Sequence, residues 1–137
     1  GIALGGWCPR GRLAEDGVIP ARYPLRETAG ADYEERTERN VLDADATLIV
    51  VFDRALHGGT ALTRELALRH GKPCLIVLAT STPAEDIVAW LHTHRVRTLN
   101  VAGPRESTAP GIGDATRTLL LAVLHILSTP SDQEDAK

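Results

Sequence analysis

Short apolar runs alternate with stretches of helical periodicity along the chain. Three of these runs predict β-strands, at residues 46–52, 73–79 and 97–102. The first of them, ATLIVVF, is apolar without alternation, which is typical of a strand that is covered on both faces. A shorter strand candidate spans residues 2–4. The alternation of strands with helices predicts βαβ units and a mainly parallel sheet, and therefore the α/β fold class.

Helical patterns fill the intervals between these strands. The residues expected on the inner face of the first helix, which is rich in charge, are Tyr33, Thr37, Val41 and Leu42. The last helix is apolar around much of its circumference and is expected to be well buried. The four predicted helices span residues 31–42, 60–70, 83 to about 94, and 112–127.

The predicted ends of the helices follow from particular residues. Gly71 is expected to end the second helix, because glycine readily adopts the left-handed conformation. Residues 82–85, Thr-Pro-Ala-Glu, have the pattern of a capping box with proline at the first helical position. Residues 7–29 and 103–111 read as long connections rich in proline and glycine. The polar tail at 129–137 is expected to be disordered, which leaves one domain at residues 1–128.

Composition places the chain among soluble globular proteins. Of its 137 residues, 43% are hydrophobic and 24% are charged, which argues against intrinsic disorder for most of the chain. The net charge is −3 and only five residues are aromatic, so nucleic acid is not an expected partner. No apolar run approaches the ~20 residues that cross a bilayer, so no membrane partner is expected.

The two cysteines, Cys8 and Cys74, cannot form a disulfide framework, and neither has a second cysteine or histidine at zinc spacing. We therefore expect no metal site built from the protein's own side chains, and a reduced, cytoplasmic protein. The chain has no methionine and opens directly on a strand-like run, so we expect its natural beginning to lie further upstream.

The turn after the strand at 46–52 is the first candidate binding loop. Ligands of open parallel sheets bind at the carboxyl ends of the strands. Gly58 and Gly59 would let the backbone approach a ligand closely, and Thr60 would cap the next helix, whose first N–H groups suit a phosphate. A glycine turn with a capped helix and no ligand explains the same residues. Neither the dinucleotide fingerprint nor the Walker loop is present.

The second candidate loop lies near the beginning of the chain. Gly6, Trp7, Cys8 and Arg10 form an unusual combination for a simple connection. Arg10 could bind a phosphate or carboxylate, and Trp7 could cover a planar ligand. Cys8 has no catalytic partner in the sequence, so a nucleophilic role has little support. For each single residue, a structural role remains the simpler explanation.

The third candidate loop follows the strand at 97–102 and should face the same edge of the sheet. Arg105 and Ser107 are candidate contacts for an anion or a ribose, and an ion pair between Arg105 and Glu106 is the structural alternative.

The charged helix at 31–42 carries a further candidate set. Arg36, Thr37 and Asn40 lie within about one turn. Threonine and asparagine are poor helix formers, which favours a role in contacts, although a solvated charged helix is the default.

Taken in order, eight motifs of the chain resemble those of the putative molybdenum carrier family. That family belongs with Rossmann-like nucleotide-binding proteins related to the lysine-decarboxylase-like, or LOG, phosphoribohydrolases and to the DNA-processing protein of transformation. The resemblance implies a Rossmann-like three-layer fold with a mainly parallel sheet flanked by helices. The motifs cover residues 2 to about 127 and are GGWCPRGR, AEDG-x-IP, YPLRET, Y-x-x-RT-x-x-NV, ATLIV, GGTALT, GKPCL and NVAGPRES-x-x-PGI.

The resemblance implies a binding protein for a phosphorylated pterin or a nucleotide-like ligand, with molybdenum cofactor as the candidate and a molybdoenzyme as its acceptor. Without that cofactor, the expected ligand is a nucleotide or phosphate. The pocket candidates carried over from the family are Gly58, Gly59, Thr60, Arg36, Thr37, Asn40, Gly6, Trp7, Cys8 and Arg10, to which the third loop adds Arg105.

The chain departs from the family's pattern at its beginning. Members open with a strand and a glycine-rich loop, SGGQTG-x-D, which helps to hold the phosphate. That first strand and loop are absent from this sequence. Either the sequence is incomplete, or the sheet lacks one strand and the site lacks half of its phosphate cradle. A homo-oligomer could cover the exposed edges of such a sheet.

A second departure concerns catalysis. The LOG phosphoribohydrolases carry GG-x-GT-x-x-E, whose glutamate assists cleavage of a glycosidic bond. Glu65 keeps the acidic position here, but Ala61 and Leu62 replace the second Gly-Thr. A non-enzymatic binding or carrier protein is therefore favoured. A nucleotide N-glycosidic-bond hydrolase with Glu65 as its catalytic residue, and a module that senses a nucleotide ligand, remain the alternatives.

Overall fold

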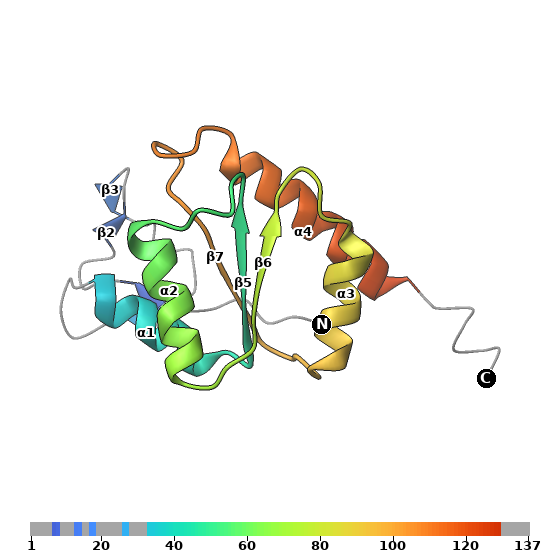
Figure 1. Cartoon of the computed structure of the whole chain (residues 1–137), viewed down its shortest axis with the longest axis horizontal. Helices are drawn as coiled ribbons and strands as arrows, with labels where there is room; N and C mark the ends of the chain where they lie inside the picture. Colours follow the sequence, from blue (N-terminus) through green and yellow to red (C-terminus); the bar gives the residue numbers. More distant parts are fainter. Residues whose placement is uncertain (1–6, 9–12, 15–16, 19–25, 28–32, 130–137) are drawn as a thin grey trace.

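The computed structural model describes residues 7–8, 13–14, 17–18, 26–27 and 33–129, and the side chains of residues 34–129. Within these ranges the chain forms a three-stranded parallel sheet flanked by four helices (Figure 1). This arrangement confirms the predicted α/β, Rossmann-like fold class. The strand expected at residues 2–4 and the tail at 130–137 lie outside the described residues.

The sheet consists of β5 (Ala46–Val51), β6 (Cys74–Leu78) and β7 (Leu99–Ala102), in the spatial order β6-β5-β7. All three predicted strands are therefore present. Both edges of β5 are paired, so that Leu48 lies opposite Leu75 on one side and Val101 on the other. Every residue of β5 is buried, as its unbroken apolar pattern predicts.

One face of the sheet is covered by α3 (Ala84–Thr93) and α4 (Ile112–Ser128), which pack against each other (Figure 1). This side contains the larger hydrophobic core. Its fully or nearly fully buried members include Leu48 and Val77 from the sheet and Ile87 from α3. Burial of such side chains supplies most of the free energy that holds the layers together.

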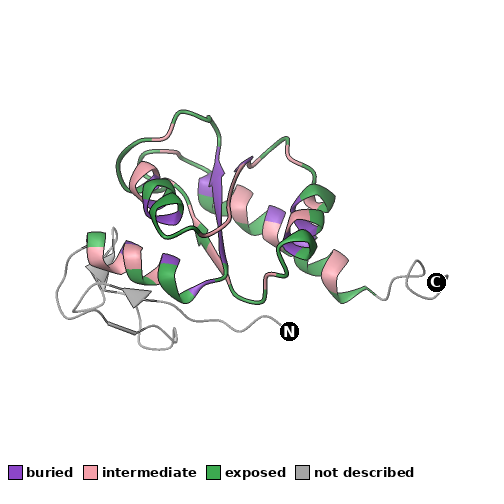
Figure 2. Ribbon diagram, turned by 60° about the horizontal axis from the view of Figure 1, so that its bottom comes forward, coloured by how far each residue is buried: buried purple, intermediate pink, exposed green. Residues whose placement is uncertain are grey.

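The other face is covered by α1 (Tyr33–Asp43) and α2 (Gly58–Arg69), whose contact contains a smaller buried cluster of Val41, Leu66 and Ala67 (Figures 1 and 2). The structure therefore has helix, sheet and helix layers.

The predicted inner face of α1 is partly correct. Thr37 and Val41 are buried as expected. Leu42 is 39% exposed, because it follows Val41 by one residue and so points about 100° away from the contact with α2.

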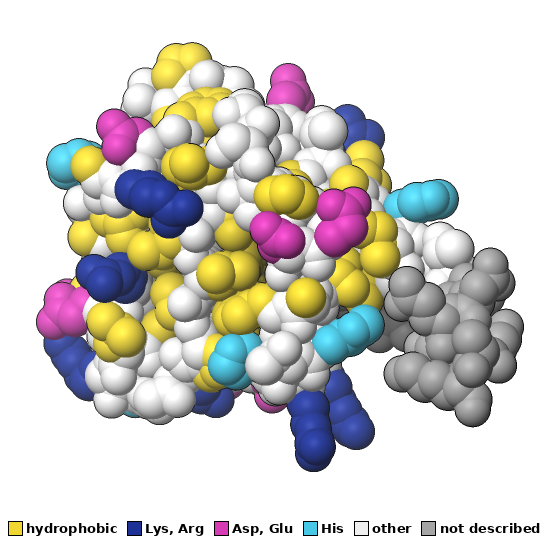
Figure 3. Space-filling view, turned by 45° about the vertical axis from the view of Figure 1, so that its right-hand side comes forward, with side chains coloured by type: hydrophobic (Ala, Val, Ile, Leu, Met, Phe, Trp, Pro, Cys, Tyr) yellow, Lys and Arg dark blue, Asp and Glu magenta, His cyan; other side chains and the backbone are white. Residues whose placement is uncertain are grey.

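The expectation that α4 would be well buried is wrong for half of its circumference. Ile112, Leu119 and Val123 face the core, whereas Leu121 and Leu124 are 54% and 43% exposed. Hydrophobic side chains accordingly reach the molecular surface on the face shown in Figure 3. An apolar helix is enclosed only if elements pack on both of its sides, and the described residues cover one side.

The helix ends are predicted correctly in one case and incorrectly in another. Gly71 has a φ of 66° and follows α2, where the N–H groups of Gly71 and Lys72 donate to the carbonyls of Leu68 and Ala67 in a Schellman motif. The prediction of a capping box before α3 is wrong. Thr82 Oγ1 instead accepts a hydrogen bond of 2.9 Å from the Leu78 N–H, and Pro83 is the N-cap.

Residues 7–29 are not a plain connection. They contain a parallel pair, β1 (Trp7–Cys8) with β4 (Arg26–Glu27), and an antiparallel pair, β2 (Leu13–Ala14) with β3 (Gly17–Val18). Two-residue strands are too short to show a periodic pattern, so the sequence gives no sign of them. No helix among the described residues is long and apolar enough to cross a membrane.

Candidate functional site

The strand order creates a switch point at one edge of the sheet. β5 leads into α2 on one face, and its neighbour β7 leads into α4 on the opposite face. Open α/β sheets bind ligands outside the carboxyl ends of two such strands, where the chain departs in opposite directions. The loops concerned are 52–57 after β5, which leads into Gly58, Gly59 and Thr60 at the start of α2, and 103–111 after β7, which is the third candidate loop. We call this region the switch-point edge.

A glycine allows the two strands to meet closely at this edge. A Cβ atom built on Gly103 would lie 2.5 Å from the carbonyl oxygen of Val50, closer than real Cβ contacts allow. The φ angle of Gly103 is not in the left-handed region, so glycine is required here for space rather than for backbone conformation. This contact fixes where the loop after β7 starts relative to β5.

The start of α2 is open. Gly58 has a φ of 52°, and no heavy atom lies within 4 Å of a Cβ built on Gly58 or Gly59. The N-cap is His57, whose side chain makes no capping hydrogen bond, and the first turn has no acidic residue. The first N–H groups of a helix have no partner within the helix, so those of Gly58 and Gly59 are oriented to bind an anion.

Thr60 is not the helix cap that the sequence suggests. It is the third residue of α2, is buried, and its N–H donates to the His57 carbonyl at 3.2 Å. The helix begins two residues earlier than predicted because Gly58 and Gly59 take part in its first turn.

The start of α4 is occupied by the chain itself. The carboxylate of Glu106 accepts hydrogen bonds from the N–H groups of Gly111 and Gly113, the second at 2.9 Å. These two bonds hold the pKa of Glu106 below its ordinary value. Of the two helices that begin at the switch-point edge, α2 therefore presents its first N–H groups and α4 does not. Arg105 and Ser107, on either side of Glu106, are exposed.

The charged helix lies beside the second candidate loop. β1, which contains Trp7 and Cys8, packs against α1. In α1, Thr37 is buried, Arg36 and Asn40 are half-buried, and Arg36 Nη2 donates to Thr37 Oγ1 at 3.2 Å. The backbone of β1 therefore lies beside the helix that carries Arg36, Thr37 and Asn40.

Other members of the second loop have no described placement. Gly6 and Arg10 lie outside the described residues, and Trp7 and Cys8 are described by their backbone alone.

The contacts between α1 and α2 involve the second half of α2. Val41 meets Leu66 and Ala67, and Glu38 Oε2 lies 3.0 Å from His70 Nε2. These contacts fix α1 beside the end of α2 that is remote from Gly58.

Glu65 lies on the exposed side of α2. Its side chain is 63% exposed, and its Oε1 atom accepts a hydrogen bond of 2.7 Å from Arg69 Nη2. This is an ordinary ion pair between residues one helical turn apart.

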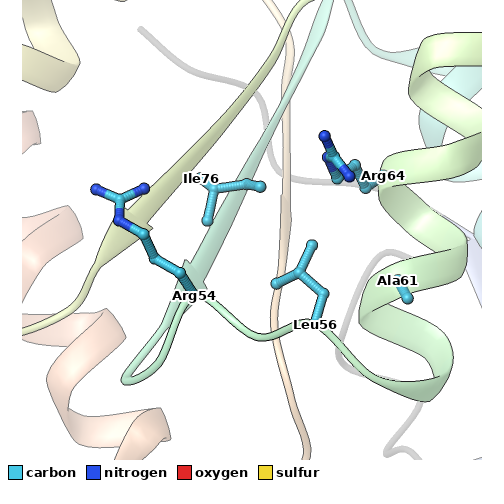
Figure 4. A pocket seen from close by; sticks show the side chains of 5 residues that line it. All are labelled: Arg54, Leu56, Ala61, Arg64 and Ile76. Atoms are coloured by element: carbon cyan, nitrogen blue, oxygen red, sulfur yellow. The ribbon is translucent and has the colours of Figure 1, made fainter.

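A hollow that the sequence did not reveal lies beside α2. It has a volume of about 420 Å³ and is lined by Arg54, Leu56, Ala61, Arg64 and Ile76 (Figure 4). Arg54 follows a buried strand almost directly, which is a recognisable signal for a residue at the edge of the sheet. Nothing in the sequence indicates that Arg64 and Ile76 lie near it, because that contact depends on how α2 packs on β6.

The fold and the switch-point edge define a Rossmann-like ligand-binding protein. Residues 1–124 match the circularly permutated YpsA SLOG family, and the chain belongs to that family. Its structure is similar to the crystal structure of a putative molybdenum carrier protein from Syntrophus aciditrophicus SB. The two chains are 44% identical with a TM-score of 0.82, over 88% of this chain and 78% of the other. No curated protein matches the chain.

Proposed function

We propose that this protein binds a phosphorylated pterin or nucleotide-like ligand at the switch-point edge. The phosphate would receive hydrogen bonds from the N–H groups of Gly58 and Gly59, with the positive end of α2 behind it. The name of the similar crystal structure makes molybdenum cofactor the first ligand to test, as cargo.

The observation that carries this proposal is the contrast between the two helix starts. Glu106 neutralises the start of α4 with two hydrogen bonds, as an acidic N-terminal side chain commonly does. The start of α2 lacks such a group and has open space around both glycines. A helix that begins without a cap at the ligand-binding edge of the sheet is best explained by an external anion.

We further propose that the loop after β7 forms the other half of the phosphate cradle. Gly103 sets the start of this loop against β5, and the loop carries Arg105 and Ser107. These residues would donate further hydrogen bonds to the phosphate. The residues present therefore fit the phosphate end of such a ligand.

The identity of the ligand is tested on the protein as it is purified. Denaturation followed by mass spectrometry of the released small molecule, with molybdenum measured in parallel, should give a phosphorylated pterin with stoichiometric molybdenum. A nucleotide or ribose phosphate without molybdenum would support the site and reject the carrier role. Release of no phosphorylated molecule, together with no binding of added pterin phosphates or nucleotides, would reject both.

The site is tested with Gly59→Asp and its uncharged control, Gly59→Asn. Both side chains have open space at this position. The carboxylate would occupy the start of α2 and should weaken binding of the released ligand about tenfold or more, the loss expected for one charge-assisted hydrogen bond. Because an acidic residue suits a helix start, the folded state should not be destabilised. Equal affinities of the two variants would place the phosphate elsewhere.

A further inference from the structure

The hollow beside α2 adjoins the loop 52–57 and extends along the β6 side of that helix. Its floor is apolar and is formed by Leu56 from the loop after β5, Ala61 from the first turn of α2, and Ile76 from β6. Ile76 faces the α2 side of the sheet, whereas its neighbours Leu75 and Val77 face the larger core on the other side. A volume of about 420 Å³ falls within the range of small-molecule sites.

Two arginines border this floor. Within the described residues, the side chains of Arg54 and Arg64 form neither an ion pair nor a hydrogen bond. Arg69, one turn and a half further along α2, is by contrast paired with Glu65. Arginines whose guanidinium groups adjoin an apolar surface are suited to hold a carboxylate or phosphate through paired hydrogen bonds.

The thiol of Cys74 does not neutralise this positive charge. Cys74 lies two residues before Ile76 on the same strand, and Arg64 is near enough to interact with it electrostatically. Burial nevertheless raises the pKa of the Cys74 thiol above its ordinary value, so that the group is uncharged at neutral pH. The hollow therefore has a net positive charge.

The placement of the two arginines restricts the shape of the ligand. In the view of Figure 4, Arg54 and Arg64 lie on opposite sides, with Ile76 and Leu56 between them. A ligand with one acidic group would engage one arginine and leave the other in solvent. A ligand with acidic groups at both ends of an apolar body would engage both and cover the floor.

We propose that this hollow is a second binding site, which takes a small organic dianion with carboxylate or phosphate groups at the two ends of a flat apolar body. The hollow shares the loop 52–57 with the switch-point edge but extends toward β6, and its existence does not depend on the ligand bound at Gly58 and Gly59.

The probe for this site is naphthalene-2,6-dicarboxylate, and 2-naphthoate, with one carboxylate, is its control. Both are titrated at constant ionic strength and followed by calorimetry. The dicarboxylate should bind at least tenfold more tightly than the monocarboxylate. Naphthalene-2,6-diphosphonate distinguishes the two acidic groups, because tighter binding of the diphosphonate points to a phosphorylated ligand and the reverse to a dicarboxylic acid.

Variants locate the probe. Arg54→Gln and Arg64→Gln should each weaken binding of the dicarboxylate about tenfold, the effect of one charged hydrogen-bonding partner. Arg69→Gln removes a charge from the same helix outside the hollow and should leave the affinity unchanged. All three side chains are exposed, so circular dichroism should show intact folding. The proposal is overturned if the dicarboxylate fails to bind at millimolar concentration, if 2-naphthoate binds equally well, or if the three variants behave alike.

Discussion

Replacement of Gly103 by alanine tests the close approach of β7 to β5. The added Cβ would lie 2.5 Å from the Val50 carbonyl oxygen. Ordinary contacts of a Cβ atom are longer than 3.0 Å, so the two backbones must separate by at least the difference between these two distances. The last paired residues of the two strands, Ile49 and Ala102, lie directly beside this point and resist the movement.

The expected cost is that of overpacking, about 1–3 kcal/mol in the free energy of unfolding. For a domain of this size, that loss lowers the melting temperature by roughly 3–12 °C. Urea and thermal unfolding followed by circular dichroism measure both quantities. Because Gly103 is itself exposed, a forecast based on exposure alone would predict almost no effect.

Gly59→Ala is the matched control for Gly103→Ala. The same atom is added, but no heavy atom lies within 4 Å of it, and the position is helical. Alanine is the better helix former, so stability should rise by up to about 1 kcal/mol. The reasoning is refuted if the Gly103 variant is as stable as the parent protein, or if the two substitutions shift stability in the same direction.

Three further predictions follow from single contacts. The folded state lowers the pKa of Glu106, so the stability that Glu106 contributes is fully present above the ordinary pKa of 4.5 and is lost as pH falls through the lowered pKa. Urea midpoints of Glu106→Gln should therefore depend less on pH in this range than those of the parent. Asp45 accepts two backbone hydrogen bonds just before β7, which lower its pKa from 3.8, so Asp45→Asn should be destabilised at pH 7 and should approach the parent as pH falls through the lowered pKa of Asp45. Glu65→Gln breaks only an exposed pair with Arg69 and should cost less than about 0.5 kcal/mol; if the protein hydrolyses a nucleotide, unchanged turnover in this variant would remove Glu65 from the mechanism.

The candidate loops could be chosen from sequence because their signals are local. Gly58, Gly59 and Arg105 lie in or just after the loops that follow apolar strands, and residues at the carboxyl ends of parallel strands share one edge. The hollow could not be found in this way. Arg54 and Arg64 flank it only because α2 packs beside β6, and no local pattern records that packing.

Capping is a second case in which local patterns were insufficient. Thr82 has the residue type and spacing of an N-terminal cap, yet its hydroxyl accepts the N–H of Leu78 at the end of β6. Glu106 is not part of such a pattern, yet it caps α4 by accepting hydrogen bonds from Gly111 and Gly113, which lie five and seven residues further along the chain. A polar side chain binds whichever backbone group the folded chain brings within reach, and sequence spacing only limits the choices.

The sequence by itself determined the four helices and the three strands of the main sheet, that this sheet is parallel, and that its central strand is buried on both faces. Hydrophobic periodicity and the residues that end helices are properties of short segments, and they persist in any context. Only the tertiary structure decided that β7 pairs with β5 rather than with β6. That pairing joins residues about fifty positions apart, and its energy comes from contacts across the sheet and its two covering layers. Because it places the switch point between β5 and β7, the position of the proposed binding site is a property of the whole fold.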